Sequence, residues 1–400
     1  MNIPERATKE QIDTMTDTEG NIRVSSVPGS GKTFVLTYRI AYLITEMFVE
    51  PSSIVALTFT NKAANEMKER IGALVDFDVS RMAISTFHSM CAKFLRFDAD
   101  KIGYERNFSI YDTDDCLTVI KRVLEAKNLD SKFARRFLSL ISNMKNSAGK
   151  FSLEEYAQQL EEVDGSLGEF PSVYREYCDR LRRENAMDFD DLLLNMLRVL
   201  QECDSARNYY QNRFRYIMVD EYQDTNTSQY ELVAMLAAKY KNLCVVGDDD
   251  QSIYKFRGAN IRNILDYEKV YPDAKVIKLE QNYRSTQNIL DAANAVIRNN
   301  RGRKEKALWT EKGAGSRVHF RQFDNAYEEA EYIADDIADK VKNDGIAYAD
   351  CAVLYRTNAQ SRLLEERMVV EGIPYHVVGG VNFYARQEIR DILAYLKTID

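Results

Sequence analysis

Residues 26–33 of the chain read SVPGSGKT, and residues 219–225 read VDEYQDT. The first stretch follows a short segment with alternating apolar residues, Ile22 and Val24, and precedes a helical pattern of apolar residues at positions 35, 36, 40 and 43. A glycine-rich loop between a strand and a helix is the context that a phosphate-binding loop requires. The two stretches together predict an ATP-hydrolysing site in an α/β fold.

The loop carries the groups that a nucleoside triphosphate needs. Around Gly29, Ser30 and Gly31 the backbone amides can close around phosphate oxygens, and the following helix adds a favourable dipole. Lys32 is predicted to reach the β- and γ-phosphates, and Thr33 is predicted to hold Mg²⁺.

The acidic stretch resolves an ambiguity in the loop. Ser26 stands where the usual loop pattern has glycine, so the loop alone leaves open an accidental glycine-rich turn. Residues 216–219 form an apolar run typical of a buried parallel strand, and ligands bind beyond the carboxyl ends of such strands. We expect Asp220 to hold Mg²⁺ and Glu221 to polarise the attacking water as a general base. The alternative, a strand that ends in a solvated acidic turn, is disfavoured by the loop upstream.

Composition narrows the class of protein. A chain of 400 residues with 45% hydrophobic content predicts two to three domains with ample cores. No run of about 18 apolar residues is present and the N-terminus has no signal-peptide core, so we expect a cytoplasmic protein with no membrane partner. The six cysteines lack CxxC spacing and indicate reduced thiols, and the three histidines form no metal-ligand cluster.

The formal net charge of −8 does not exclude nucleic acid, because binding depends on local positive patches. Basic clusters occur at residues 132–136, 180–183 and 301–306, although each is more typical of a solvated face.

The order of apolar runs predicts the domain organisation. Strand-like runs alternate with helical patterns, which favours a parallel sheet covered on both faces; the runs are 54–60, 82–87, 216–220, 243–248 and 276–280. Residues 104–186 break this rhythm and are predicted to form a helical insertion. A second α/β unit is predicted after residue 276, with strands at 276–280, 317–323 and 351–357 and helices at 286–299, 326–342 and 360–371.

Four further segments place polar and aromatic residues after strands: 57–67, 85–90, 245–259 and 281–285. Hydroxyls and amides can bind phosphates while aromatic faces stack on bases, as in proteins that grip single-stranded nucleic acid. Core packing is the alternative for any single phenylalanine, but it explains all four segments poorly.

These motifs resemble those of superfamily 1A DNA helicases of the UvrD/PcrA/Rep group, from about residue 7 to the end of the chain. The resemblance implies two RecA-like domains, each a parallel sheet flanked by helices, that clamp ATP and step 3′→5′ along single-stranded DNA. It also implies ATP and Mg²⁺ as cofactors, single-stranded DNA and its junctions with duplex as partners, a monomeric state, and work with repair or replication proteins. By this resemblance the first domain, 1A, spans 1–103 and 187–276, the insertion 1B spans 104–186, the partial second domain 2A spans 277–381, and 382–400 begin a further insertion, 2B.

The resemblance assigns further nucleotide-site residues. Gln11 matches an adenine-reading glutamine, although Ala7 and Thr8 precede it where the family has Leu-Asn. Arg39 and Tyr283 match the pair that sandwiches the adenine ring.

Two more positions match residues that sense or stabilise the γ-phosphate. Gln251 matches a sensor that couples the nucleotide state to the grip on DNA, and Arg284 matches an arginine finger from the second domain. Gln223 completes the DExQD signature.

For DNA, the matching positions are Phe59, Asn61, His88, Tyr254, Phe256 and Arg257. Phe256 stands where relatives often carry tryptophan, and its ring can stack on a base with less area.

The resemblance predicts an incomplete second domain. Residues 372–400 match only the entry to 2B, so we expect a fragment that binds ATP weakly, hydrolyses it slowly and does not unwind duplex. The alternative is a catalytically silent DNA- or protein-binding fragment, or one half of a split helicase. A small-molecule kinase or GTPase is disfavoured, because no guanine-reading NKxD motif is present.

Overall fold

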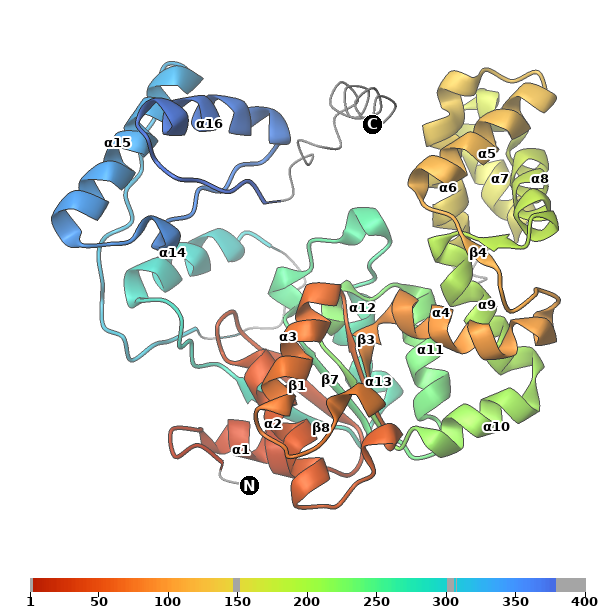
Figure 1. Ribbon diagram of the computed structural model, residues 1–400, viewed down its shortest axis with the longest axis horizontal. Coiled ribbons are helices and arrows are strands. Elements are labelled where there is room, and N and C mark those ends of the chain that lie inside the picture. Colours follow the sequence, from red (N-terminus) through yellow and green to blue (C-terminus); the bar gives the residue numbers. More distant parts are fainter. Residues whose placement is uncertain (1–2, 147–151, 301–305, 307, 379–400) are drawn as a thin grey trace, which may run out of the picture. The chain divides into compact units, whose positions relative to one another are not determined.

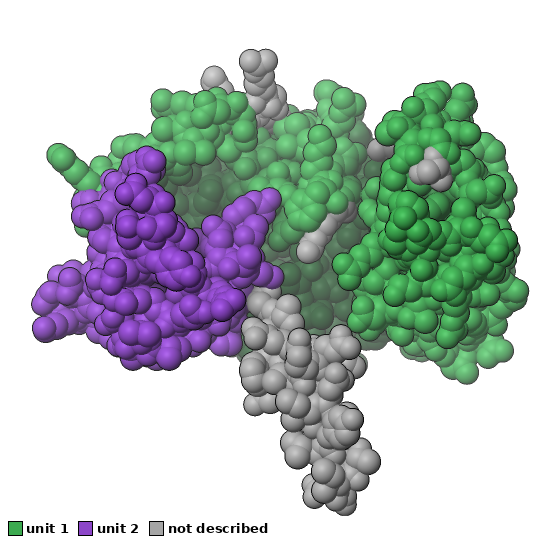
Figure 2. Space-filling view, turned by 90° about the horizontal axis from the view of Figure 1, so that it is seen from above, with its two compact units in different colours: residues 1–317 green, residues 318–400 purple. Residues whose placement is uncertain are grey.

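The computed structural model describes residues 3–146, 152–300, 306 and 308–378. The chain divides into two compact units, residues 1–317 and 318–400, which Figure 2 draws in different colours. Among the described residues, no helix combines the length and the apolar character needed to cross a membrane.

A six-stranded parallel sheet lies at the centre of the first unit (Figure 1). Its strands run in the order β3-β2-β6-β7-β1-β8, and every neighbouring pair is parallel. The strands are β1 (Ile22–Ser26), β2 (Ile54–Thr58), β3 (Ala83–Thr86), β6 (Tyr216–Val219), β7 (Leu243–Gly247) and β8 (Lys275–Leu279). Because all six strands point the same way, the residues that follow β1, β6 and β7 meet at one edge of the sheet.

Helices cover both faces of this sheet, because its central strands β2, β6 and β7 are apolar on both sides. Ile54 and Ala56 of β2 lie in one core, and Val55 and Leu57 lie in the other. The first core contains side chains from α1 (Lys9–Thr16), α2 (Lys32–Thr45) and α3 (Asn61–Gly72). The second contains side chains from α4 (Phe87–Asp98), α9 (Phe189–Glu202), α10 (Asp204–Arg213), α11 (Thr227–Ala237), α12 (Arg262–Leu265) and α13 (Tyr267–Val270). The α/β class predicted from the sequence is confirmed.

The segment predicted to be helical, 104–186, has its own core. Four helices gather around it (Figure 1): α5 (Thr113–Ala126), α6 (Ala134–Asn146), α7 (Leu153–Val163) and α8 (Phe170–Arg183). Two short parallel strands, β4 (Ser109–Ile110) and β5 (Ala186–Met187), pair where the chain enters and leaves this bundle. We call these four helices the helical insertion.

A buried ion cluster joins the helical insertion to α9. The Nζ atom of Lys145 on α6 lies 2.7 Å from Asp188 and 2.6 Å from Asp191, and its side chain is only 1% exposed. The hydroxyl of Tyr177 donates a further hydrogen bond of 3.0 Å to Asp188. Although burial opposes ionisation, Lys145 and these hydrogen bonds hold the pKa of Asp188 below its usual value. Burial raises the pKa of Asp191, in spite of the same lysine.

The structure corrects three strand predictions. The strand predicted to open the second α/β unit, 276–280, is β8, and it pairs with β1 as an edge strand of the first sheet. There Ile277 and Leu279 complete the core above α1 and α2. The segments 317–323 and 351–357 form no strands, because short extended segments are stable only when they are paired.

The helices predicted after residue 280 are present. They are α14 (Gln287–Ile297), α15 (Ala326–Asp344) and α16 (Ser361–Val370). In the second unit α15 and α16 pack through Ala334, Met368 and Ile373. The predicted start of the 2B insertion, 382–400, lies outside the described residues.

Candidate nucleotide-binding site

The loop predicted to bind phosphate follows β1 and leads directly into α2. Gly29 and Gly31 have φ values of 68° and 90°, a region that other residues rarely adopt, and Gly31 caps the helix. Ser26 occupies the position where the usual pattern has glycine, and its hydroxyl donates a 3.0 Å hydrogen bond to the carbonyl of Gly247 on β7. The serine is therefore compatible with the tight turn, since its side-chain hydroxyl is paired.

A distant segment holds the outer side of the loop. The side-chain amide of Asn282 donates to the carbonyl of Pro28 at 2.6 Å, and the backbone amide of Tyr283 donates to the carbonyl of Gly29 at 2.9 Å. A Cβ atom added to Gly29 would lie 2.8 Å from the Cβ of Arg284. Residues 282–284 thus lie directly against the loop, and the predicted arginine finger is in the same contact.

A cavity of about 270 Å³ lies beside this contact. Gln11, Ser30, Tyr283 and Trp309 are among the residues that line it. The side-chain amide of Gln11 donates to the carbonyl of Ser30 at 3.1 Å, which ties α1 to the loop. Two of the three predicted adenine contacts, Gln11 and Tyr283, are therefore brought together at one cavity.

Arg39 does not line that cavity. Its side chain is 2% exposed, and its Nη atoms donate to the carbonyls of Thr14, Asp17 and Thr18 at the end of α1. These bonds hold α1 against α2, so adenine stacking by Arg39 stays a prediction that requires the side chain to leave them.

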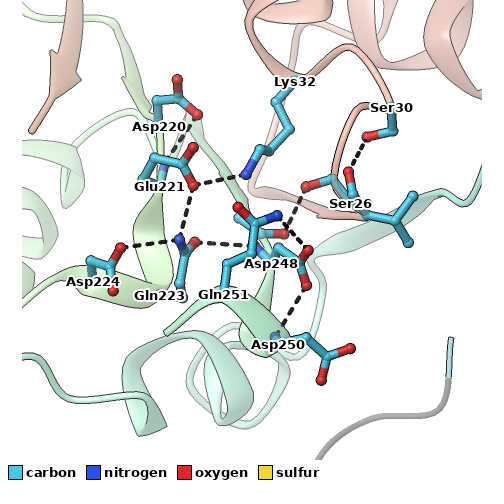
Figure 3. A network of polar contacts seen from close by, with 12 residues as sticks. Ser26, Ser30, Lys32, Asp220, Glu221, Gln223, Asp224, Asp248, Asp250 and Gln251 are labelled. Carbon is cyan, nitrogen blue, oxygen red and sulfur yellow. Dashed lines mark hydrogen bonds and ion pairs between the residues drawn. The ribbon is translucent and has the colours of Figure 1, made fainter. Parts of the chain in front are cut away.

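Lys32 and Glu221 form the central ion pair of the site (Figure 3). Lys32 Nζ lies 2.8 Å from Glu221 Oε2, and the two side chains are 11% and 37% exposed. The residues are 189 positions apart in the chain and meet because β1 and β6 end at the same edge of the sheet. Glu221 adopts φ 50°, a left-handed conformation that is unusual outside glycine and that commonly marks functional sites.

The carboxylate of Asp220 is buried beside this pair. Burial, together with the neighbouring Glu221, raises the pKa of Asp220 to about 6. A buried carboxylate next to a second carboxylate is a favourable environment for a divalent cation, which would offset both charges. Thr33, the second residue of α2, offers the hydroxyl expected in such a site, so these residues fit Mg²⁺.

Hydrogen bonds connect the acidic turn to the strand beside it. The Gln223 side-chain amide donates to Glu221 at 2.8 Å, while its carbonyl accepts from the backbone amide of Asp248 at 3.0 Å. Gln251 donates to Asp248 at 2.7 Å. The predicted γ-phosphate sensor therefore shares one network with the predicted general base (Figure 3).

The predicted DNA contacts begin at the carboxyl ends of β2 and β3. Phe59 is half-buried with its ring edge-on to Phe87 at 6.1 Å, and Asn61 is exposed at the start of α3. The ring of His88 packs edge-on to Phe189 at 5.9 Å. Burial lowers the pKa of His88, and the charge of Asp190 opposes that shift.

The other predicted DNA contacts follow β7. The rings of Tyr254 and Phe256 lie 5.9 Å apart and are 36% and 76% exposed, so both offer a face to solvent. Arg257 lies in the same short 3-10 turn, Lys255–Arg257. The predicted contacts thus come from three strand ends of one sheet edge, the edge that also carries the nucleotide-site residues.

Comparison with known families agrees with this arrangement. The UvrD/REP helicase N-terminal domain matches residues 7–272, and the UvrD-like helicase C-terminal domain matches residues 277–400. The chain belongs to the UvrD/REP helicase family. The N-terminal match ends before β8 and the C-terminal match begins within it, so in this UvrD/REP-family chain the strand at the start of the C-terminal match completes the sheet of the N-terminal one.

Individual relatives of this UvrD/REP-family chain include two staphylococcal proteins. It is 50% identical over 392 residues to the ATP-dependent DNA helicase PcrA of Staphylococcus epidermidis, which covers 98% of this chain and 53% of that protein. It is 50% identical over 393 residues to the ATP-dependent DNA helicase PcrA of Staphylococcus aureus, with the same shares of the two proteins. The chain spans about half the length of the curated relatives that it matches.

Two residues at the site were missed by sequence reasoning. Trp309, the only tryptophan of the chain, lines the cavity with Gln11 and Tyr283, and its carbonyl accepts a hydrogen bond from the Asn282 amide. Lys306 belongs to the basic cluster 301–306, which the sequence predicts to be a solvated face. Its side chain is 4% exposed instead, and it forms ion pairs with Asp248, at 2.7 Å, and with Asp249. The one signal in the sequence was the run of three aspartates at 248–250, which has no neighbouring cation.

Proposed function

We propose that this chain is the ATP-hydrolysing motor part of a DNA helicase that moves along single-stranded DNA. The observation that carries the proposal is the 2.8 Å pair of Lys32 and Glu221, at the shared carboxyl edge of β1 and β6. A lysine from a phosphate-binding loop and a carboxylate next to a second, buried carboxylate are the two halves of a phosphoryl-transfer site.

Nucleotide binding would use both sides of the loop. The base would enter the cavity between Gln11 and Tyr283, with Trp309 as a further aromatic wall. The phosphates would lie on the backbone amides around Gly31 and compete with Glu221 for the ammonium of Lys32. Thr33 and Asp220 would hold Mg²⁺, which supplies charge neutralisation at the phosphates.

Hydrolysis would depend on the network around Glu221. Once phosphate has taken over Lys32, the Glu221 carboxylate is free to accept a proton from the attacking water. Gln223 keeps that carboxylate oriented by its 2.8 Å hydrogen bond. Gln251 joins the same network by donating to Asp248, whose backbone amide donates to Gln223. Arg284 would stabilise the charge that develops on the transferred group.

DNA would bind along the same edge of the sheet. The exposed rings of Tyr254 and Phe256 are suited to base stacking, and Asn61 and His88 lie after the neighbouring strands. We extend the proposal to 3′→5′ movement, to junctions between single strands and duplex, and to repair or replication partners. A monomer in the cytoplasm is part of the same proposal.

The test is ATP hydrolysis by this chain with and without a single-stranded oligonucleotide, beside Glu221→Gln and the exposed control Glu125→Gln. Nucleotide binding is followed separately through Trp309 fluorescence, with and without Mg²⁺. We expect DNA to stimulate hydrolysis in the parent and in Glu125→Gln but not in Glu221→Gln. A fluorescence response to ATP without any hydrolysis would instead support the silent binding fragment, and no response at all would refute the nucleotide site.

A further inference from the structure

A larger cavity, of about 540 Å³, lies elsewhere in the first unit. Its wall is formed by Arg81, Met82 and Ala83 at the start of β3, by the second half of α4 together with Lys101, and by α10. We call it the basic-rimmed cavity. The nucleotide-site residues follow the carboxyl ends of β1, β6 and β7, whereas this cavity lies at the amino end of β3, the edge strand of the parallel sheet. The two sites are therefore separate.

The floor of the basic-rimmed cavity is apolar and fixed. The ring of Phe94 stacks on Tyr210 at 4.7 Å and on Phe214 at 5.5 Å. The hydroxyl of Tyr210 donates to Asp98 at 2.6 Å, and Asp98 forms an ion pair of 2.7 Å with Lys101. Because the buried Tyr210 hydroxyl and Asp98 carboxylate are already paired, the floor offers aromatic surface to a bound side chain.

The rim carries an excess of positive charge. Four cations line the cavity, Arg81, Lys93, Lys101 and Arg213, against the single carboxylate of Asp98, which leaves a net charge of three positive (four minus one). The chain as a whole carries −8, so the excess is local. Two large aromatic side chains complete the rim, Phe97, which is 61% exposed, and Tyr209, which is 54% exposed.

We propose that the basic-rimmed cavity binds an acidic segment of a partner protein that inserts one large apolar side chain. A cavity of this size suits a single buried anchor, and aromatic and arginine side chains are the residues that dominate such contacts. The ring of cations around the apolar floor selects carboxylates on either side of the anchor. Single-stranded nucleic acid would instead need successive stacking faces, and the exposed rings suited to that role, Tyr254 and Phe256, follow the carboxyl end of β7.

Peptide binding at the basic-rimmed cavity is separate from the proposed function, so it can be tested without ATP. The probes are short fluorescein-labelled peptides in which aspartates flank Phe-Leu, Trp-Leu or, as a reference, Ala-Ala. Binding to the whole chain is measured by fluorescence anisotropy at low salt. We expect at least one peptide with an apolar centre to bind, and the Ala-Ala reference to bind at least about tenfold more weakly.

Two double variants connect binding to the cavity. In Lys93→Glu/Arg213→Glu the dissociation constant of the bound peptide should rise at least about tenfold, since both rim charges are reversed. In Lys121→Glu/Arg122→Glu, which makes the same change in charge on exposed residues of α5, it should stay within about twofold. Thermal unfolding of both variants checks that the fold is kept, and Phe97→Ala, an exposed position, gives a second test that leaves the charge unchanged.

Three results would overturn the proposal. The first is no binding of any apolar-centred peptide up to about 1 mM. The second is an equal loss in both double variants, which would indicate a general charge effect. The third is displacement of the peptide by a single-stranded oligothymidylate whose own affinity falls in Lys93→Glu/Arg213→Glu, which would make the cavity a nucleic-acid contact.

Discussion

Two of the clusters in the first unit that join a lysine to neighbouring carboxylates differ in how open they are. At the nucleotide site, Lys32, whose side chain is 11% exposed, pairs with Glu221, whose side chain is 37% exposed, beside the buried Asp220. At the base of the helical insertion, Lys145 pairs with Asp188 and Asp191, and its side chain is 1% exposed. The same chemical groups are accessible in one place and sealed in the other.

The difference indicates two roles. A sealed ion pair has no second partner to take, so Lys145 holds α6 and α9 together and its loss leaves buried charge. The Lys32–Glu221 pair is partly open to solvent through Glu221, so it can exchange a partner at lower cost than the sealed cluster. Lys32 is therefore suited to leave Glu221 for a phosphate, while Lys145 keeps the helical insertion on the sheet domain.

The largest effect is expected for Lys145→Met. The substitution keeps most of the volume but leaves Asp188 and Asp191 buried without their cation, so the free energy of unfolding should fall by about 3–5 kcal/mol. Urea unfolding followed by circular dichroism measures this change. The control is Lys132→Met, which breaks an ion pair with Asp130 whose side chains are 68% and 50% exposed; it should cost less than about 1 kcal/mol.

A second pair of substitutions separates charge from packing at the same cluster. Adding Asp188→Asn and Asp191→Asn to Lys145→Met removes the unpaired charges and should recover part of the lost stability. If Lys145→Met alone proved as mild as Lys132→Met, the contrast between the sealed and the open cluster would have no energetic basis.

Lys32→Met should reverse the pattern, with a large effect on function and a small effect on stability. Removing the ammonium proposed to bind phosphate should weaken ATP hydrolysis by about 10²–10³-fold, while the free energy of unfolding should change by less than in Lys145→Met, because Glu221 is partly exposed. ATP hydrolysis assays and urea unfolding measure the two effects on the same preparation. A destabilisation as large as that of Lys145→Met would show that Lys32 is structural.

Asn146→Ala tests a second contact at the base of the helical insertion. Asn146, the last residue of α6, donates to Asp190 at 2.7 Å and accepts from Asn226, the cap of α11, at 2.6 Å. We expect a loss of about 1–3 kcal/mol from these two partly buried bonds, measured by urea unfolding. Asn143→Ala on the same helix is exposed and should change stability by less than about 0.5 kcal/mol. Equal effects of the two variants would indicate that Lys145 alone holds the helical insertion to the sheet domain.

The smallest effect should be a dependence on pH at His88. Burial lowers the pKa of His88 from 6.5. Between the folded-state pKa and about pH 6.5, the unfolded chain therefore binds a proton that the folded chain does not. The stability that His88 contributes is therefore complete above about pH 6.5 and is lost as the pH falls through the folded-state value. The stability difference between the parent and His88→Gln should shrink on acidification, measured by urea unfolding at several pH values. Because Asp190 opposes the shift, Asp190→Asn should enlarge it; a difference that is constant with pH would contradict the assignment.

Some parts of the fold and site could be predicted because their signals are local. The glycines of the loop, the apolar strand before Asp220 and the helix-forming segments each specify their own conformation within a few residues. The helices after residue 280 were found for the same reason. The strands predicted at 317–323 and 351–357 were wrong, because an apolar alternation predicts a strand only if a partner strand lies beside it.

The missed residues all act over long distances in the chain. Lys306 reaches Asp248, which lies 58 positions before it, and the adjacent Asp249. Trp309 meets α1 and the loop at one cavity only because residues 282–284 pack on Gly29. Neither contact has a periodic or motif signal. Arg39 shows the opposite case, since a motif assigned it to the base while the structure has it bonded to the end of α1.

The sequence by itself determined the α/β order of helices and strands, and it predicted the chemistry: a loop suited to phosphate and two carboxylates after a buried strand. Those features depend on neighbouring residues, whose spacing is fixed by the chain. Only the tertiary structure decided which groups meet, because the sheet order places β1 between β7 and β8 and so brings Lys32 to Glu221 across 189 positions. It also decided that the Lys145 cluster is buried while Glu221, the partner of Lys32, is partly exposed, since burial depends on every element packed around a side chain.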